Sequence, residues 1–344
     1  MICYICNRLH MNEVMTVMAT IKDVANRAGV SVATVSRVLN GNGYVHEDTR
    51  SKVEQSIREL NYTPNEVARS LYKRKSKLIG LLLPDIMNPY FPQLARGVED
   101  EMQENDYRLI FGNSDESKKK EMEYIQTFVQ NNVVGVISST NDPDADMYTG
   151  LKIPVVFLDR TSSDRPSVYA DGRQGGRIAA QEIIRRGSKV ITVIQGPADV
   201  RPAQERFEGA VEVLEEQVAA YQVLKTTSFS LIEAEEFAQQ VFIEFPDTDG
   251  VIASNDIMAS AVVKEAFRLG KRVPEDVQII GFDDILLSRL LAPPLSTIHQ
   301  PAYEMGREAA RLLIGLIEGQ HIERSSIEFS VEFIERQTTR KVES

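Results

Sequence analysis

The 344-residue chain has only two cysteines, Cys3 and Cys6. Two thiols so close together cannot cross-link a chain of this length, so a disulfide-stabilised fold is excluded. The sequence has no run of 18 apolar residues and no apolar core of a signal peptide, so we expect a cytoplasmic protein without a membrane partner. The four histidines lack the spacing of metal ligands, and we predict no metal and no cofactor.

Motifs of common enzyme classes are also missing. The sequence contains neither a GxxxxGK[ST] phosphate-binding loop nor a GxSxG nucleophile elbow, and the glycines of segment 172–176 do not keep the GxGxxG spacing. Asp283 and Asp284 could serve as an acid–base pair, but adjacent residues on a strand point to opposite faces. We therefore expect a binding protein and not an enzyme.

Negative charge is in excess, since 50 Asp and Glu residues outnumber 39 Lys and Arg residues and give a net charge of −11. An even excess of this sign argues against nucleic-acid binding. Between Met18 and Lys77, however, eleven basic side chains stand against six acidic ones, so this segment carries about +5 and the remainder about −16. A basic head on an acidic body indicates a separate nucleic-acid module, whose binding to DNA weakens steeply with salt.

Residues 1–17 show neither a helix period nor a strand period, and a regular pattern begins only at Met18. We expect a disordered N-terminal extension here. The alternative is that Cys3 and Cys6 form a metal or redox pair, but a lone CxxC without a second pair of ligands is a weak signal.

Three short helices are predicted for residues 18–63. Apolar residues from Ile21 recur at intervals of three and four, Gly29 follows as a turn residue, and Ser31 can cap a second helix. A third helix begins near Glu47 and places apolar side chains on one face. This arrangement is typical of a helix-turn-helix DNA-binding domain, although any three-helix packet shows the same period.

The second predicted helix has the composition of a recognition helix. Arg37 can bond guanine bidentately in the major groove, while Val32 and Ala33 can contact a thymine methyl group. Other polar side chains of this helix suit phosphate oxygens, which position a protein without reading sequence. These side chains are Ser31, Thr34, Ser36 and Asn40.

A fourth, short helix is predicted after the head. Thr63 is a suitable N-cap, Pro64 suits the first helical position, and Glu66 stands at the capping-box position. A helix of about two turns is marginal alone in water. We assign residues 64–77 to this helix and a basic linker.

From Leu78 onward, short apolar runs alternate with helical stretches, which is typical of βαβ units and of parallel sheets covered on both faces. About 260 residues are too many for one such sheet, so we predict two doubly wound lobes with a cleft between them. Ligands of open α/β sheets bind at the carboxyl ends of the strands, so site residues are expected there.

Two segments resemble a known family. Residues 21–40, IKDVANRAGVSVATVSRVLN, and residues 61–71, NYTPNEVARSL, resemble the lactose-repressor family of bacterial transcription factors. The resemblance extends from about Met18 to about Lys341. It implies an all-α helix-turn-helix head with a hinge helix, followed by an α/β two-lobed body like that of periplasmic sugar-binding proteins.

The resemblance also implies a role for the segment after Pro64. In the family this segment is a hinge helix that folds on operator DNA, pairs with its copy in the dimer and inserts a leucine into the minor groove. The matching leucine is Leu71, with further contacts from Asn65, Ala68 and Arg69. The alternative for Leu71 is burial against the body.

In the body, the resemblance implies two lobes, each built from two separate segments of the chain. The N-terminal lobe takes residues 78–170 and about 301–328, and the C-terminal lobe takes residues 171–300 and about 329–344. A small molecule is expected in the cleft between them.

The side chains expected in this cleft suit a sugar, whose hydroxyl groups need planar polar partners and whose C–H surfaces need aromatic faces. The set resembles the pocket of ribose-binding proteins, which implies D-ribose or a close derivative as effector. Ser138-Ser139 stands where that pattern has an asparagine, so one hydroxyl contact is lost or water-mediated, and Tyr90 replaces a phenylalanine. The expected ligand residues are Asn88, Tyr90, Phe91, Asp159, Arg160, Arg206, Phe229, Asn255, Asp283 and Gln300.

The resemblance therefore implies a homodimeric repressor of a sugar-utilisation operon. The two recognition helices of the dimer lie about 34 to 36 Å apart and contact a pseudo-palindromic operator. Binding of the sugar releases the repressor from this operator. A heptad tail is lacking, so we expect a dimer and not a tetramer.

Several alternatives stay open. The chain could be a catabolite regulator of the same family controlled by a phosphoprotein partner, or a purine-type regulator whose ligand is a corepressor. Asp159, Asn255 and Asp283 could instead cap strand ends. A sugar-transport protein is excluded by the basic head and the missing signal peptide.

Overall fold

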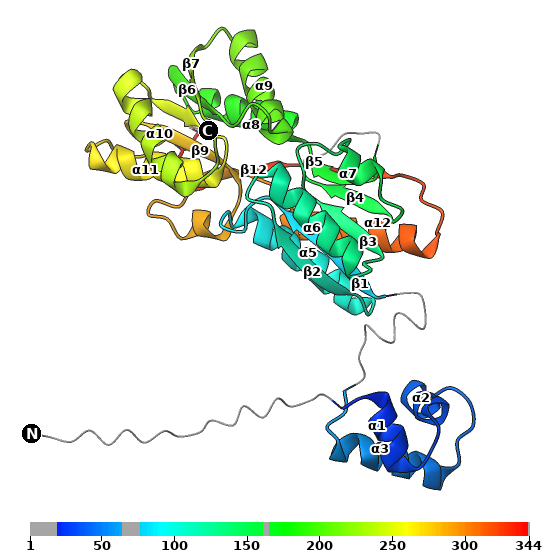
Figure 1. Cartoon of the computed structure of the whole chain (residues 1–344). Coiled ribbons are helices and arrows are strands. Elements are labelled where there is room, and N and C mark those ends of the chain that lie inside the picture. The colour runs from blue at the N-terminus through cyan, green and yellow to red at the C-terminus, as the bar shows by residue number, and fades with distance from the viewer. Residues whose placement is uncertain (1–18, 64–75, 161–164, 343–344) are drawn as a thin grey trace, which may run out of the picture. The chain divides into compact units, whose positions relative to one another are not determined.

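The computed structural model describes residues 19–63, 76–160 and 165–342. The chain divides between Ser76 and Lys77 into two compact units, a helical head and a larger α/β body (Figure 1). The predicted N-terminal extension and the predicted hinge helix lie outside the described residues.

Within residues 19–63 the head is a bundle of three helices, as predicted: α1 (Ile21–Ala28), α2 (Val32–Asn40) and α3 (Glu47–Glu59). Thr20 caps α1, and Gly29 ends it with a φ of 67°, which glycine adopts without strain. The turn between α1 and α2 follows from this glycine. The buried core of the head consists of Val24, Ala25, Val35, Val38 and Val53.

The described residues of the body form two six-stranded sheets. The first sheet comprises β1 (Leu78–Leu83), β2 (Arg108–Asn113), β3 (Gly135–Ser138), β4 (Val155–Leu158), β5 (Ser167–Ala170) and β11 (Ser326–Phe329). The second comprises β6 (Val190–Gln195), β7 (Ala220–Lys225), β8 (Gly250–Ile252), β9 (Gln278–Asp283), β10 (Ser296–His299) and β12 (Glu332–Ile334). The strand orders are β11-β5-β4-β3-β1-β2 and β12-β10-β9-β8-β6-β7. All pairs are parallel except β10 with β12.

Helices cover both faces of each sheet, which explains why central strands such as β1 are almost entirely apolar. The helices of the first lobe are α5 (Tyr90–Glu104), α6 (Lys118–Gln130), α7 (Asp146–Thr149) and α12 (Ala302–Glu318). Those of the second are α8 (Gly172–Arg185), α9 (Arg201–Glu216), α10 (Leu231–Glu244), α11 (Asp256–Arg268) and the 3-10 turn η1 (Leu286–Arg289). The two-lobed, doubly wound body predicted from the sequence is confirmed.

The chain passes between the lobes at three places. It leaves the first sheet after β5, returns between β10 and α12, and passes over again between β11 and β12. Each sheet is therefore completed by a short strand from segment 326–334.

Two pairs of helices approach so closely that only glycine fits where they cross. A Cβ atom on Gly176 of α8 would lie 2.0 Å from the carbonyl oxygen of Arg206 in α9. A Cβ atom on Gly306 of α12 would lie 2.1 Å from the carbonyl oxygen of Leu94 in α5. Because α5 begins with Tyr90 and α9 carries Arg206, this close packing fixes the helices that present both side chains.

We predict that Gly176→Ala destabilises the protein by about 1–3 kcal/mol, because the added methyl group must push two backbones apart. Gly172→Ala on the same helix is the matched control, since its Cβ atom would meet no atom closer than 3.4 Å. Denaturant unfolding measures both variants. Equal losses for the two substitutions would contradict the importance of the close approach.

Candidate ligand pocket and DNA-binding face

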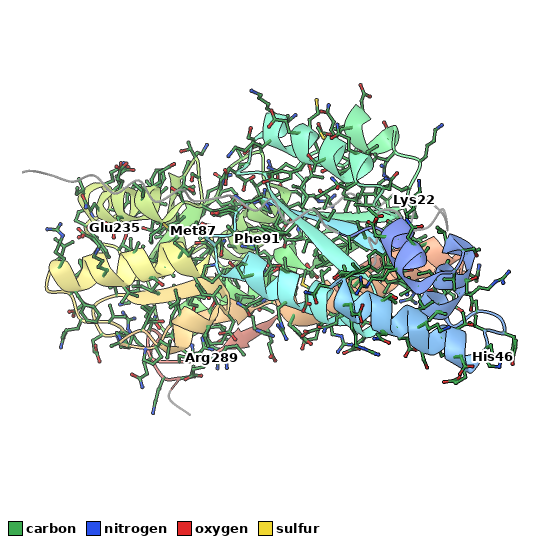
Figure 2. The ribbon with its side chains drawn as sticks, turned by 60° about the horizontal axis from the view of Figure 1, so that its bottom comes forward. Lys22, His46, Met87, Phe91, Glu235 and Arg289 are labelled. Atoms are coloured by element: carbon green, nitrogen blue, oxygen red, sulfur yellow. The ribbon has the colours of Figure 1, made fainter. Side chains whose placement is uncertain are left out.

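A pocket in the body collects side chains from both lobes. Its lining consists of Asn88, Tyr90, Phe91, Asp159 and Arg160 from the first lobe, and Val200, Pro202, Arg206, Phe229, Asn255 and Asp283 from the second. Phe91, at the start of α5, lies in the interior of the body (Figure 2). Nine of the ten predicted ligand residues line this pocket, and the tenth, Gln300, is hydrogen-bonded to one of them, Asp283.

The strand ends place these residues together. Asn88 follows β1, and Asp159 and Arg160 follow β4 directly. In the second lobe, Asn255 follows β8 and Asp283 is the last residue of β9. The carboxyl ends of parallel strands meet at one edge of a sheet, so residues far apart in sequence converge there.

Both pocket aspartates have unusual backbone conformations. The φ angle is 69° at Asp159 and 109° at Asp283. Residues with a Cβ atom rarely adopt positive φ, and such outliers cluster at functional sites where the surroundings hold them. The strain at the two strand ends thus marks the pocket independently of its lining.

Arg206 is held on three sides. Its Nη2 atom lies 3.3 Å from Oδ1 of Asp283, and its Nη1 donates to the carbonyl oxygen of Ser254 at 2.9 Å. The guanidinium lies over the ring of Phe282, 3.9 Å from its centroid. Its Nε is buried without a hydrogen-bond partner among the described residues. A residue that lines the pocket therefore keeps one buried N–H donor without a partner among the described residues.

Burial raises the pKa of both carboxyls in the pocket. Burial raises the pKa of Asp283 to about 8, and the charges of Asp256 and Asp159 add to the effect while Arg206 opposes it. Burial also raises the pKa of Asp159, against the opposing charges of Arg206 and Arg160. The hydroxyl of Tyr90 donates to Oδ1 of Asp159 at 2.8 Å. Additional hydroxyl donors would stabilise the charged carboxylates, so the arrangement suits a hydroxyl-rich ligand.

Two predicted ligand residues also have structural roles. Oδ1 of Asn255 accepts a hydrogen bond from the backbone N–H of Met258 at 2.8 Å and so caps the helix α11, whereas the alternative interpretation expected it to cap a strand end. Nε2 of Gln300 donates to Oδ1 of Asp283 at 2.8 Å and so acts on the pocket through that aspartate.

The serine pair after the third predicted strand does not line the pocket. The Oγ of Ser138 is bonded to the hydroxyl of Tyr148 at 2.7 Å, and the Oγ of Ser139 is buried without a partner among the described residues. The lost or water-mediated hydroxyl contact stays a prediction.

Sequence reasoning missed four residues at or behind the pocket. Val200 ends the loop after β6 and Pro202 lies in the first turn of α9, and the strand end was the signal that could have indicated them. Glu116 and Asn141 follow β2 and β3 and bond the guanidinium of Arg160. No sequence motif indicates the latter pair.

On the head, α2 presents its predicted contact residues in two ways. Ser31, Val32, Ala33 and Arg37 are exposed, while Thr34, Ser36 and Asn40 are half-buried. The Oγ of Ser31 accepts from the N–H of Thr34 at 3.2 Å, and Nδ2 of Asn40 donates to the carbonyl oxygen of Ser36 at 2.8 Å. Asn65, Ala68, Arg69 and Leu71 lie outside the described residues.

Other kinds of site find no support within the described ranges. No group of three His, Cys, Asp or Glu side chains there could hold a metal ion. None of the helices described is long and apolar enough to cross a membrane.

Comparison with known proteins decides the family. The model for bacterial regulatory proteins of the lacI family matches residues 20–65, and that for a periplasmic binding protein-like domain matches residues 180–339. The ribose operon repressor of Bacillus subtilis (strain 168) is 61% identical over 324 residues, which cover 94% of this chain and 99% of the relative. The chain belongs to the lacI family of bacterial regulatory proteins.

Solved structures of the lacI family confirm the predicted fold of head and body. The lac repressor dimer bound to operator and the anti-inducer ONPF has a TM-score of 0.85 at 25% identity, covering 94% of this chain and 100% of that one. A lacI-family regulator from Enterococcus faecium with bound ribose has a TM-score of 0.68 at 29% identity, covering 76% and 98%. Family membership makes the chain a transcriptional regulator and not an enzyme, as predicted.

The raised pKa of Asp283 predicts how stability depends on pH. The folded protein keeps this carboxyl protonated up to about pH 8, whereas an ordinary aspartate has a pKa of 3.8. The resulting stabilisation is complete below that lower value and is lost as the pH rises through 8.

Asp283→Asn cannot ionise and should escape this loss. We expect its melting temperature, relative to that of the unsubstituted protein, to rise steadily between pH 5 and pH 8 in the absence of ligand. Thermal unfolding across this range measures the difference. Asp256, whose pKa burial raises to about 6, leaves a residual slope of the same sign in both proteins. A pH-independent difference between the two would contradict the prediction.

Proposed function

We propose that this lacI-family regulator is a cytoplasmic repressor of ribose-utilisation genes. In this proposal, residues 18–63 bind a pseudo-palindromic operator, residues 64–77 form the hinge, and D-ribose binds between the lobes formed by residues 78–170 with 301–328 and 171–300 with 329–344. The observation that carries it is the pocket of buried aspartates, arginines and aromatic rings in a chain 61% identical to a ribose operon repressor.

The charges of the pocket favour an uncharged sugar. Arg206 lies beside Asp283, and Arg160 is paired with Glu116 at 2.6 Å. The charge of Arg160 is thus already neutralised by Glu116, and a sugar phosphate would bring its own negative charge beside the buried carboxyls of Asp159 and Asp283. Hydroxyl groups, in contrast, can donate to the aspartates and accept from the guanidiniums, while Phe91 and Phe229 supply apolar faces.

Ligand and operator are coupled in this proposal through the body. A sugar bonded to both lobes stabilises one arrangement of them, and the hinge responds to that arrangement. Linkage requires each ligand to change the affinity of the other by the same factor, typically about 5- to 150-fold. Release of the operator by ribose is the sign that we propose.

A homodimer is supported by an exposed apolar surface on η1. Leu286, Leu287 and Leu290 are 65%, 51% and 72% exposed. Three leucines within five residues are a large apolar exposure for a lone subunit, which a second copy can cover. The likeness to a lac repressor dimer agrees with this assignment.

Calorimetry of the full chain tests the proposal. We expect ribose to bind, ribose 5-phosphate and purines to bind more weakly or not at all, and operator DNA to lower the ribose affinity about 5- to 150-fold. Arg206→Ala should abolish the ribose response and keep operator binding, because the sugar hydroxyls lose a buried partner. Purine binding that operator strengthens would favour the corepressor alternative, and absence of any small-molecule binding would favour control by a phosphoprotein.

Arg37→Ala tests direct readout by α2. We expect the variant to lose about 1–3 kcal/mol of binding free energy for the preferred base at one position of each half-site, because the bidentate contact to guanine disappears. Its preference at the other positions should stay unchanged. Arg58→Ala on α3 removes the same charge and serves as the control, with a small loss that is equal for all sequences. Competition binding with single-base operator variants measures both, and a uniform loss for Arg37→Ala would contradict base recognition.

A further inference from the structure

The positive charge of Arg160 is neutralised by Glu116, a residue that does not line the pocket. Its Nη1 donates to Oε2 of Glu116 at 2.6 Å and its Nη2 donates to Oε1 of the same carboxylate at 2.8 Å. Nη1 also donates to Oδ1 of Asn141 at 3.0 Å. The Arg160 side chain is 3% exposed, whereas that of Glu116 is 43% exposed. A buried pocket residue is thus held by a carboxylate at the surface.

The remaining donors of Arg160 lie on a single edge. A guanidinium carries five N–H groups in one plane, and Glu116 and Asn141 take three of them. Nε is buried without a hydrogen-bond partner among the described residues. The Nε hydrogen and the second Nη2 hydrogen run parallel, so this edge matches two neighbouring hydroxyl groups. Glu116 and Asn141 thus hold one edge of the Arg160 guanidinium, and the Nε at its other edge has no hydrogen-bond partner among the described residues.

The loop that carries Glu116 is strained in a way that core packing does not explain. Asp115 and Glu116, between β2 and α6, have φ angles of 48° and 57°. Asp115 bonds Nδ2 of Asn113 and Nζ of Lys120, which hold the loop in place. With this backbone conformation, the half-exposed side chain of Glu116 places its carboxylate against the guanidinium of Arg160.

We propose that Glu116 is a positioning residue for the sugar pocket, which orients Arg160 so that its Nε edge faces two adjacent hydroxyl groups of the ligand. Asn141 assists by bonding both partners, since its Nδ2 also donates to Oε2 of Glu116 at 3.4 Å. An arginine side chain that is already held in its bound orientation before the ligand arrives loses less conformational entropy on binding. The inference rests on the proposed function and adds to it how the pocket recognises a diol.

A double-mutant cycle tests this role. Ribose affinity is measured by calorimetry on the full chain and on Glu116→Gln, Arg160→Lys and the double variant. We expect Glu116→Gln to weaken ribose binding about tenfold, and the double variant to bind no more weakly than Arg160→Lys alone, because Glu116 acts only through the guanidinium. Glu123→Gln is the matched control, since Glu123 pairs with Lys119 on α6 and should leave the affinity unchanged.

Stability and operator binding separate positioning from general support of the fold. Each variant is checked by thermal unfolding and by operator affinity, which should both stay close to those of the unsubstituted chain. If Glu116→Gln fails to fold, Glu116→Asp keeps the charge but shortens the reach, and it should still weaken ribose binding. Unchanged affinity, or additive losses in the cycle, would overturn the positioning role while leaving the proposed function intact. Failure of the unsubstituted chain to bind ribose would overturn both.

Discussion

The balance of buried charge around Arg206 is the constraint on which the pocket depends. Asp159 belongs to the first lobe and Asp283 to the second, and the positive charge of Arg206 opposes the rise in pKa of both carboxyls. Without that charge, two buried carboxylates would repel each other and lose their hydration. The lobes can bring these groups together only because the guanidinium, the hydroxyl of Tyr90 and bound protons lower the free energy of the two buried carboxyl groups.

This balance needs accurate placement, which the helix packing provides. Glycines at the crossings of α8 with α9 and of α5 with α12 let backbones touch, and α9 and α5 carry Arg206 and Tyr90 into the pocket. The aspartates are placed differently, by strand ends with positive φ. Rigid helices and strained strand ends together orient the polar groups before any ligand arrives.

The parts of the structure that follow from local pattern could be predicted, and those that depend on long-range contacts could not. The apolar runs at residues 78–83 and 155–158 predict the observed bounds of β1 and β4, because these strands are covered on both faces. The edge strands β7 and β11 show no such run, since much of each strand is only partly buried and carries polar residues. The pocket residues follow from strand ends and from family resemblance. Glu116 stands 44 positions before Arg160, and only the folded chain reveals their contact.

The three passages between the lobes have a consequence for how the protein is made. The head has its own core and precedes every strand of the body, so it can fold as soon as it leaves the ribosome. Neither sheet of the body is complete until residues 326–334 have been synthesised, because β11 and β12 come last in the chain and join different sheets. A nascent subunit can therefore fold its DNA-binding head long before the body that senses the effector. The two functions are acquired in a fixed order during synthesis.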